Sequence, residues 1–217
     1  MKYGSGDTGE AMQRPIFDAN HQIFRESVRH FVATHIVPNH ARWTADGRVD
    51  KAMFRAAGEQ GLLGMAVPER YGGGGIDDFR YNTVVNEEVT ISGASASGLC
   101  ITLHNDICLP YFLTYGTEEQ QARWLPGLVS GDLMTAIAMT EPGTGSDLAG
   151  IATAAVRDGE GYVINGSKTF ITNGINADLV IVVARTGSDP HGGLTLFVVE
   201  DGMPGFERGR NLDKMGM

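Results

Sequence analysis

The chain has 217 residues, 42% of them hydrophobic, which is enough for one large hydrophobic core or two smaller ones. Its formal net charge of −9 argues against nucleic acid as a partner, because neutralising a phosphate backbone requires a basic surface. The sequence shows neither a signal-peptide pattern nor an apolar run of transmembrane length, so we expect a cytoplasmic protein without membrane insertion.

Helix signals dominate the first part of the chain, after a polar and glycine-rich stretch over residues 1–14 that predicts a disordered tail. An all-helical domain is expected over residues 15–130. Each expected helix follows a capping residue: Asp18 before an amphipathic run that ends at Pro38, Asp50 before Lys51–Gln60, Asp78 before Phe79–Ile91, and Thr117 with Gln120 as a capping box. Cys100 and Cys108 lie in an apolar segment without a CxxC motif, and we expect them to be buried free thiols.

The pattern changes near residue 130, where β-branched runs begin to alternate with Asp-Gly, Asn-Gly and Gly-Gly turns. These runs predict strands over Leu133–Met139, Leu179–Ala184 and Leu194–Glu200. We therefore expect a small, antiparallel, barrel-like β domain over residues 131–217. The fold class that follows is α+β, with the helical domain first.

A hairpin is expected around the Asn-Gly dipeptide at 165–166, a strong signal for a two-residue turn. Its strands would cover Tyr162–Asn165 and Ser167–Thr172. Side chains alternate along a strand, which would place Lys168, Phe170 and Thr172 on one face. An aromatic ring beside a hydroxyl would suit a planar heterocycle, although a cross-strand aromatic pair on a half-exposed sheet explains the same pattern.

The segment AIAMTEPGTGSDLAG, residues 136–150, joins an apolar strand to a turn rich in Gly, Thr and Ser. Glycines at 143 and 145 permit positive φ and a close approach of backbone N–H groups to a ligand. Hydroxyls are available at Thr140, Thr144 and Ser146. The turn would suit a ring edge with alternating N–H and C=O groups or a pyrophosphate, and the alternative is an ordinary glycine-rich hairpin turn.

Together the two motifs resemble the acyl-CoA dehydrogenase family. The first reads T-E-P-G-x-G-S-D and the second N-G-x-K-x-aromatic-I-T-N-G, and the likeness runs from about Pro15 to Met217. Three further segments are similar to the long-chain branch of the family: RPIFDANHQIFRESVRHF, QGLLGMAVPERYGGGG and HGGLTLFVVEDGMPGFERGR.

The resemblance implies that the chain binds FAD. The residues that match cofactor contacts are Ile137, Met139, Thr140, Gly145, Ser146, Phe170, Ile171 and Thr172. It places the Thr140 hydroxyl near the reactive edge of the isoalloxazine ring and Phe170 against that ring, where many relatives have Trp. Ser146, Pro190 and His191 match residues near the acyl-CoA substrate, the last two in the loop at 188–193.

The reaction implied by the resemblance is α,β-dehydrogenation of medium-chain to long-chain fatty acyl-CoA thioesters. Electrons would pass to an electron-transferring flavoprotein, and the enzyme would be a homo-oligomer, either a tetramer or a dimer. The family's base is a glutamate in a C-terminal helical domain, which we expect to be absent here because the chain stops near the end of the β domain. No catalytic residue is therefore expected in this chain, since the counterpart of Glu141 is not the base.

Other functions stay open on the same residues. The chain could be a flavin or acyl-CoA binding module, or one half of a split enzyme. An acyl-CoA oxidase or a flavin monooxygenase on the same fold is a related alternative. No metal site is expected, because His30, His35 and His40 recur at a spacing that rotates around a helix.

Overall fold

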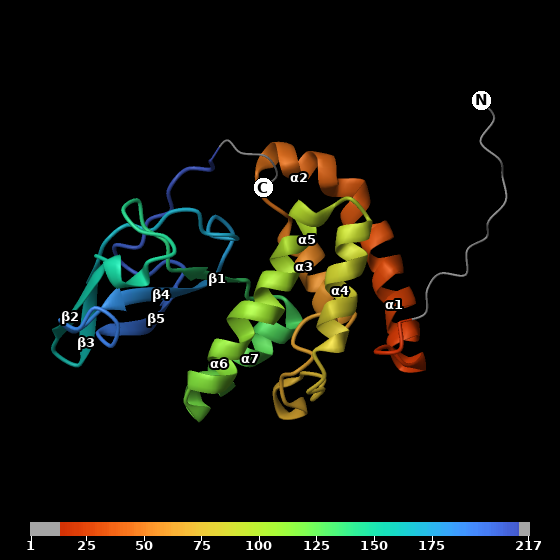
Figure 1. Cartoon of the computed structure of the whole chain (residues 1–217), viewed down its shortest axis with the longest axis horizontal. Helices are drawn as coiled ribbons and strands as arrows, with labels where there is room; N and C mark the ends of the chain where they lie inside the picture. The colour runs from red at the N-terminus through yellow and green to blue at the C-terminus, as the bar shows by residue number, and fades with distance from the viewer. Residues whose placement is uncertain (1–13, 213–217) are drawn as a thin grey trace.

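The computed structural model describes residues 14–212, in which a helical domain is followed by a sheet domain (Figure 1). The helical elements are α1 (Ala19–Phe31), η1 (Val32–Ile36), η2 (Val37–Asn39), α2 (His40–Asp46), α3 (Lys51–Glu59), η3 (Glu69–Tyr71), α4 (Arg80–Ile91), α5 (Ser95–Thr102), η4 (Leu103–Cys108), α6 (Leu109–Tyr115) and α7 (Glu118–Ser130). The helical first domain is therefore confirmed. The expected tail lies outside the described residues except for Arg14, whose guanidinium donates to both carboxylate oxygens of Glu87 at 2.5 and 2.6 Å.

Local capping signals placed two helix starts correctly. The Asp18 carboxylate accepts the N–H groups of Asn20 and His21 at the start of α1, and Thr117 and Gln120 form a reciprocal capping box before α7. The expected end at Pro38 is wrong, because the chain stays helical through η1 and η2 into α2. Proline is tolerated there because it stands in the first turn of a new 3₁₀ segment, where its missing N–H has no intrahelical partner to lose.

The second domain is a mixed and open sheet. Its strands are β1 (Thr135–Ala138), β2 (Ala154–Asp158), β3 (Gly161–Asn165), β4 (Leu179–Arg185) and β5 (Leu194–Glu200). The central strand β4 runs parallel to β1 and antiparallel to β5, and it meets β2 only at its last residue. The expected antiparallel, barrel-like arrangement is therefore wrong, because β1 and β4 are joined by a long crossover and no pairing among residues 14–212 closes the sheet.

The expected hairpin at 165–166 is also wrong. β3 pairs with β2 instead, across a turn in which Gly159 has φ +59°, and residues 167–172 form no strand. Gly166 does not have positive φ. A Cβ added there would lie only 2.2 Å from the Thr153 hydroxyl oxygen, so the glycine serves a close approach between two segments and not a tight turn.

A buried histidine connects the two domains. His104, on η4, is fully buried and its ring nitrogens lie 3.0 Å from the Leu128 carbonyl and 2.8 Å from the Thr135 hydroxyl. Burial lowers the pKa of His104 to about 4, so the ring is neutral: Nε2 donates to Leu128 and Nδ1 accepts from Thr135. A cluster of apolar side chains, including Leu125, Leu128 and Ile181, also packs the helices against the sheet.

We expect acid to destabilise the fold through His104. Its pKa is about 6.5 in an unfolded chain and about 4 in the folded protein, so the unfolded chain takes up a proton first as the pH falls. The free energy of unfolding should decrease between pH 6.5 and pH 4, by roughly 3 kcal/mol at most. Urea unfolding at several pH values should show a shallower decrease for His104→Gln, which offers one donor and one acceptor and does not titrate. An identical decrease in the two proteins would contradict this role.

Both cysteines are buried free thiols, as expected. Burial raises the pKa of Cys100 to about 12 and that of Cys108 to about 11, which makes both thiols poor nucleophiles at neutral pH. Among residues 14–212, no helix has the length and apolar character needed to cross a membrane.

Candidate functional site

The glycine-rich turn begins directly after β1, which ends at Ala138. Backbone bonds between Glu141 and Thr144, at 2.9 and 3.2 Å, hold it in shape. Neither Gly143 nor Gly145 uses positive φ, contrary to one reason for expecting glycine there. A Cβ built on either residue would meet no atom within 4 Å, so the backbone of the turn faces open space. That space is what a flat ligand lying along the main chain requires.

The loop over residues 166–172 lies against this turn. The Thr169 N–H donates to the Thr140 carbonyl at 2.9 Å, which places Phe170 next to the end of β1. The Phe170 side chain is 71% exposed, whereas Lys168 turns inward and its side chain is only 11% exposed. The expectation that Lys168, Phe170 and Thr172 share one face of a strand is therefore wrong, although the two candidate motifs do come together.

Phe170 combines two unfavourable features. Its φ of +57° lies in the left-handed region, which costs a bulky residue of order 1–3 kcal/mol. Its ring also remains largely exposed to water. Residues held in such conformations cluster at ligand sites, where the surrounding structure enforces them. The loop therefore presents an aromatic face for a ligand to cover.

A buried ion pair anchors the same loop. Lys168 Nζ lies 2.8 Å from the Glu141 carboxylate and donates to the Met139 carbonyl at 3.0 Å. Burial alone would raise the pKa of Glu141, but hydrogen bonds from Lys168 and from the N–H groups of Ala152 and Thr153 outweigh burial and lower the pKa to about 2. The carboxylate is therefore ionised and fully engaged at neutral pH.

Asn173 joins the loop to the helical domain. It also has positive φ, and its side-chain amide donates to the carbonyls of Cys100 and Thr135 at 3.4 and 3.1 Å. Asn173 thus ties the loop to α5 and to the first residue of β1, while Thr169 ties it to the turn at the other end of that strand. Lys168 and Asn173 both stand in the second motif, but they were missed as site residues because their hydrogen-bond partners are far away in the sequence.

The other expected FAD contacts fall into two groups. Gly145, Ser146 and Thr172 are exposed around the turn and loop. The side chains of Ile137 and Ile171 pack into hydrophobic clusters, the first against the helical domain and the second within the sheet. Both side chains are half-buried in these clusters.

The loop at 188–193 is held beside the glycine-rich segment by Arg185. Its guanidinium donates to the carbonyls of Ile151, Ala149 and Asp189 at 2.9–3.0 Å. The Asp189 carboxylate in turn accepts the N–H groups of His191 and Gly192. Pro190 and His191 are both exposed in this loop.

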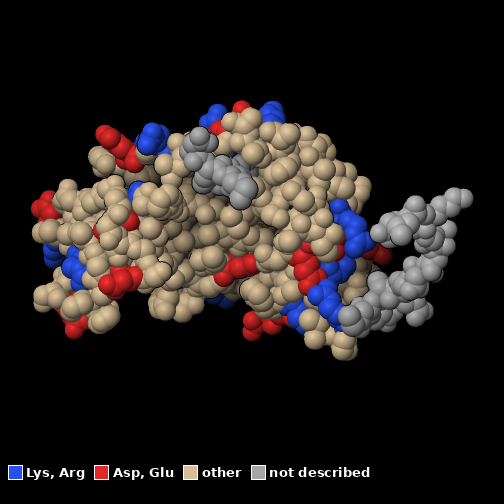
Figure 2. All heavy atoms as spheres, turned by 45° about the horizontal axis from the view of Figure 1, so that its top comes forward, with Lys and Arg blue, Asp and Glu red and all other residues tan. Residues whose placement is uncertain are grey.

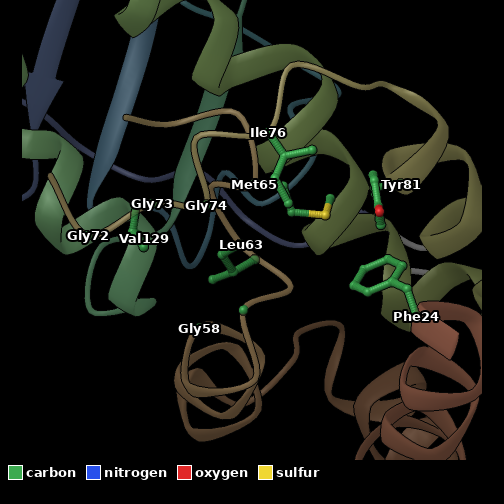
Figure 3. Close-up of a pocket in the computed structure, with 11 residues that line it drawn as sticks. Phe24, Gly58, Leu63, Met65, Gly72, Gly73, Gly74, Ile76, Tyr81 and Val129 are labelled. Carbon is green, nitrogen blue, oxygen red and sulfur yellow. The ribbon is translucent and has the colours of Figure 1, made fainter. Parts of the chain in front are cut away.

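The helical domain has a separate cavity of about 300 Å³ (Figure 3). It is lined by apolar residues and glycines, including Phe24, Leu63, Met65, Ile76 and Tyr81. None of the candidate site residues lines it, so it is distinct from the site built on the turn and the loop.

A group of ion pairs lies in the helical domain, outside the candidate site. Figure 2 shows Lys, Arg, Asp and Glu side chains at both ends of this face, with a dense group at the helical end, whereas the middle of the face carries few charges. Ion pairs join α1 to α4, because Arg25 contacts Glu87 and both Arg25 and Arg29 contact Glu88. Arg14, which precedes α1, also contacts Glu87. These pairs hold two helices together and include no candidate site residue.

Comparison with known proteins agrees with this geometry. The family model of the acyl-CoA dehydrogenase N-terminal domain matches residues 18–132, and that of the middle domain matches residues 136–217. The mitochondrial long-chain specific acyl-CoA dehydrogenase of Sus scrofa is 47% identical over 94% of this chain and 47% of its own length. The chain thus spans about half the length of the curated relatives it matches.

Solved structures give the same result. A crystal structure of an acyl-CoA dehydrogenase from Geobacillus kaustophilus has a TM-score of 0.88 and 47% identity, over 93% of this chain and 53% of that one. An acyl-CoA dehydrogenase complexed with FAD from Bacillus anthracis has a TM-score of 0.83 and 33% identity, over 94% of this chain and 35% of that one. The chain belongs to the acyl-CoA dehydrogenase family.

Proposed function

We propose that this chain forms the helical and sheet domains of an FAD-dependent enzyme that dehydrogenates medium-chain to long-chain fatty acyl-CoA thioesters. The observation that carries the proposal is Phe170, an exposed aromatic ring in a strained conformation beside the Thr140 turn. The 47% identity to a long-chain specific relative supports the substrate class.

The residues present fit FAD. The turn leaves open space beside Gly143 and Gly145, Phe170 offers an uncovered ring, and Thr140 stands half-buried between them. In the proposed complex Phe170 packs against the flavin ring, and the Thr140 hydroxyl donates to its edge. Bound FAD would supply the acceptor for the hydride that leaves the β-carbon of the substrate.

The proposal also includes the residues that contact the substrate and the partners of the enzyme. Ser146, Pro190 and His191 are exposed, and we propose that they contact the CoA part of the thioester. The bonds from Arg185 to Ala149 and Asp189, which join the glycine-rich segment to the loop at 188–193, support this assignment. The base and the remaining wall of the site would come from a C-terminal helical domain. We further propose an electron-transferring flavoprotein as electron acceptor, a homo-oligomeric enzyme and a cytoplasmic location. We refer below to the protein that includes the C-terminal domain as the full-length protein.

Substitution of Phe170 tests the proposal. Because the ring is 71% exposed, Phe170→Trp should keep both FAD affinity and thermal stability, whereas overpacking a closed core costs roughly 1–3 kcal/mol. Phe170→Ala should weaken FAD binding roughly tenfold through lost stacking. FAD titration and thermal unfolding of the full-length protein measure both effects, with Phe112→Trp, at a buried ring, as the overpacked control. Unchanged FAD affinity in Phe170→Ala would refute the contact.

Substitution of Thr140 should have a smaller effect, on the rate of flavin reduction. Thr140→Val keeps the shape of the side chain and removes one hydrogen bond, worth on the order of 1 kcal/mol, or roughly fivefold in a rate. We expect slower flavin reduction by acyl-CoA in the full-length protein, with the fold unchanged. Rapid-mixing measurements under anaerobic conditions would show the difference, and equal reduction rates and flavin potentials would remove Thr140 from the site.

A further inference from the structure

The buried ion pair between Glu141 and Lys168 has no counterpart among the residues that the resemblance assigns to FAD or substrate. Glu141 is 7% exposed and the Lys168 side chain 11%, and their charged atoms lie 2.8 Å apart. Burying two charges is unfavourable unless hydrogen bonds satisfy them. Both groups meet that condition here, which indicates a specific structural task.

The pair brings three segments together at one carboxylate. The Glu141 oxygens accept the N–H groups of Ala152 and Thr153, at 2.8 and 2.9 Å, just before β2 begins. Lys168, from the loop over residues 166–172, donates to the same carboxylate. It also donates to the Met139 carbonyl at 3.0 Å, directly after β1. The turn, the start of β2 and the loop therefore share one anchor.

Lys168 stands two residues before the strained aromatic ring. Between them, the Thr169 N–H donates to the Thr140 carbonyl at 2.9 Å, and Phe170 follows with φ +57°. A left-handed Phe holds only when the chain around it is fixed. We infer that Glu141 and Lys168 are positioning residues, which hold the Thr140 hydroxyl and the Phe170 ring in the positions that bind FAD. This inference rests on the proposed function. They act through their neighbours and touch no reacting atom.

The variant that tests the inference is Lys168→Met in the full-length protein. Lys51→Met is the matched control, because Lys51 also pairs with a carboxylate, Asp178, but outside the turn and loop. We expect Lys168→Met to weaken FAD binding at least about tenfold. Without FAD, amide hydrogen exchange over residues 167–172 should be at least about tenfold faster. Lys51→Met should leave both quantities within about twofold of the wild type.

Two further variants keep the test decisive if Lys168→Met does not fold. The double variant Glu141→Gln with Lys168→Met leaves no unpaired charge and should still weaken FAD binding and shift the visible spectrum of the bound flavin. Lys168→Arg should restore affinity and spectrum. Wild-type affinity and wild-type exchange in the double variant would overturn the inference. If the wild type bound no FAD, the proposed function would fail, and the exchange over 167–172 would still decide whether the pair orders the loop.

Discussion

The 217-residue chain on its own should dehydrogenate acyl-CoA at least about 10²–10⁴-fold more slowly than the full-length protein, the range attributed to a general base. Glu141 is a carboxylate at the start of the glycine-rich turn, and it is unsuited to that role. Lys168 and two backbone N–H groups occupy its oxygens, and these bonds outweigh burial to lower its pKa to about 2. A carboxylate whose pKa lies so far below neutral pH is a weak proton acceptor.

The measurement is anaerobic bleaching of FAD by palmitoyl-CoA, with the chain alone and with the full-length protein. Adding a separately expressed C-terminal helical domain should restore a yellow complex that acyl-CoA bleaches. Tight FAD binding and full-rate bleaching by the chain alone would mean that a base lies among these residues. Glu141→Gln would then be the next variant to measure.

We expect Gly166→Ala to disrupt both stability and cofactor binding. The new Cβ would lie 2.2 Å from the Thr153 hydroxyl oxygen and 2.7 Å from the Thr153 Cα, so backbone must move. Overpacking of this kind costs roughly 1–3 kcal/mol, and each kcal/mol lowers the melting temperature by roughly 2–4 °C in a chain of this size. The displaced loop carries Lys168 and Phe170, so FAD affinity should fall as well.

Gly143→Ala is the matched control for this substitution. Gly143 also lacks positive φ, and its added Cβ would meet nothing within 4 Å. Thermal unfolding should therefore be unchanged in Gly143→Ala and shifted to lower temperature in Gly166→Ala. Equal melting temperatures in the two variants would show that the loop accommodates a Cβ and that its position is not fixed by the contact with Thr153.

Features with short-range causes could be predicted from the sequence. The caps at Asp18 and Thr117 involve partners within three residues, and both form as expected. A continuous apolar run likewise identified β4, because this central strand buries both of its faces. The apolar run of β5 located that strand as well, although its residues are mostly half-buried. The two motifs that converge on the site were found for a similar reason: each is a contiguous segment.

Features that depend on distant segments could not be predicted in this way. Gly166 is a glycine because Thr153 passes close to it, yet in the sequence it has the form of a hairpin turn. Because a hairpin was expected at Gly166, Phe170 was placed on one face of a strand. In the structure Phe170 is exposed in a loop and has a left-handed φ. The parallel pairing of β1 with β4 is likewise set by a crossover, which neither strand's own residues encode.

The most direct test of the account is an anaerobic titration of the full-length protein with acyl-CoAs of increasing chain length, followed by its visible absorbance. We expect a yellow protein whose flavin is bleached by medium-chain to long-chain acyl-CoA, stays reduced when oxygen is admitted for a short time, and is reoxidised by an electron-transferring flavoprotein. Rapid reoxidation by oxygen would favour an oxidase on the same fold. A colourless protein that does not take up added FAD, or a bound flavin that no acyl-CoA bleaches, would contradict the proposed function.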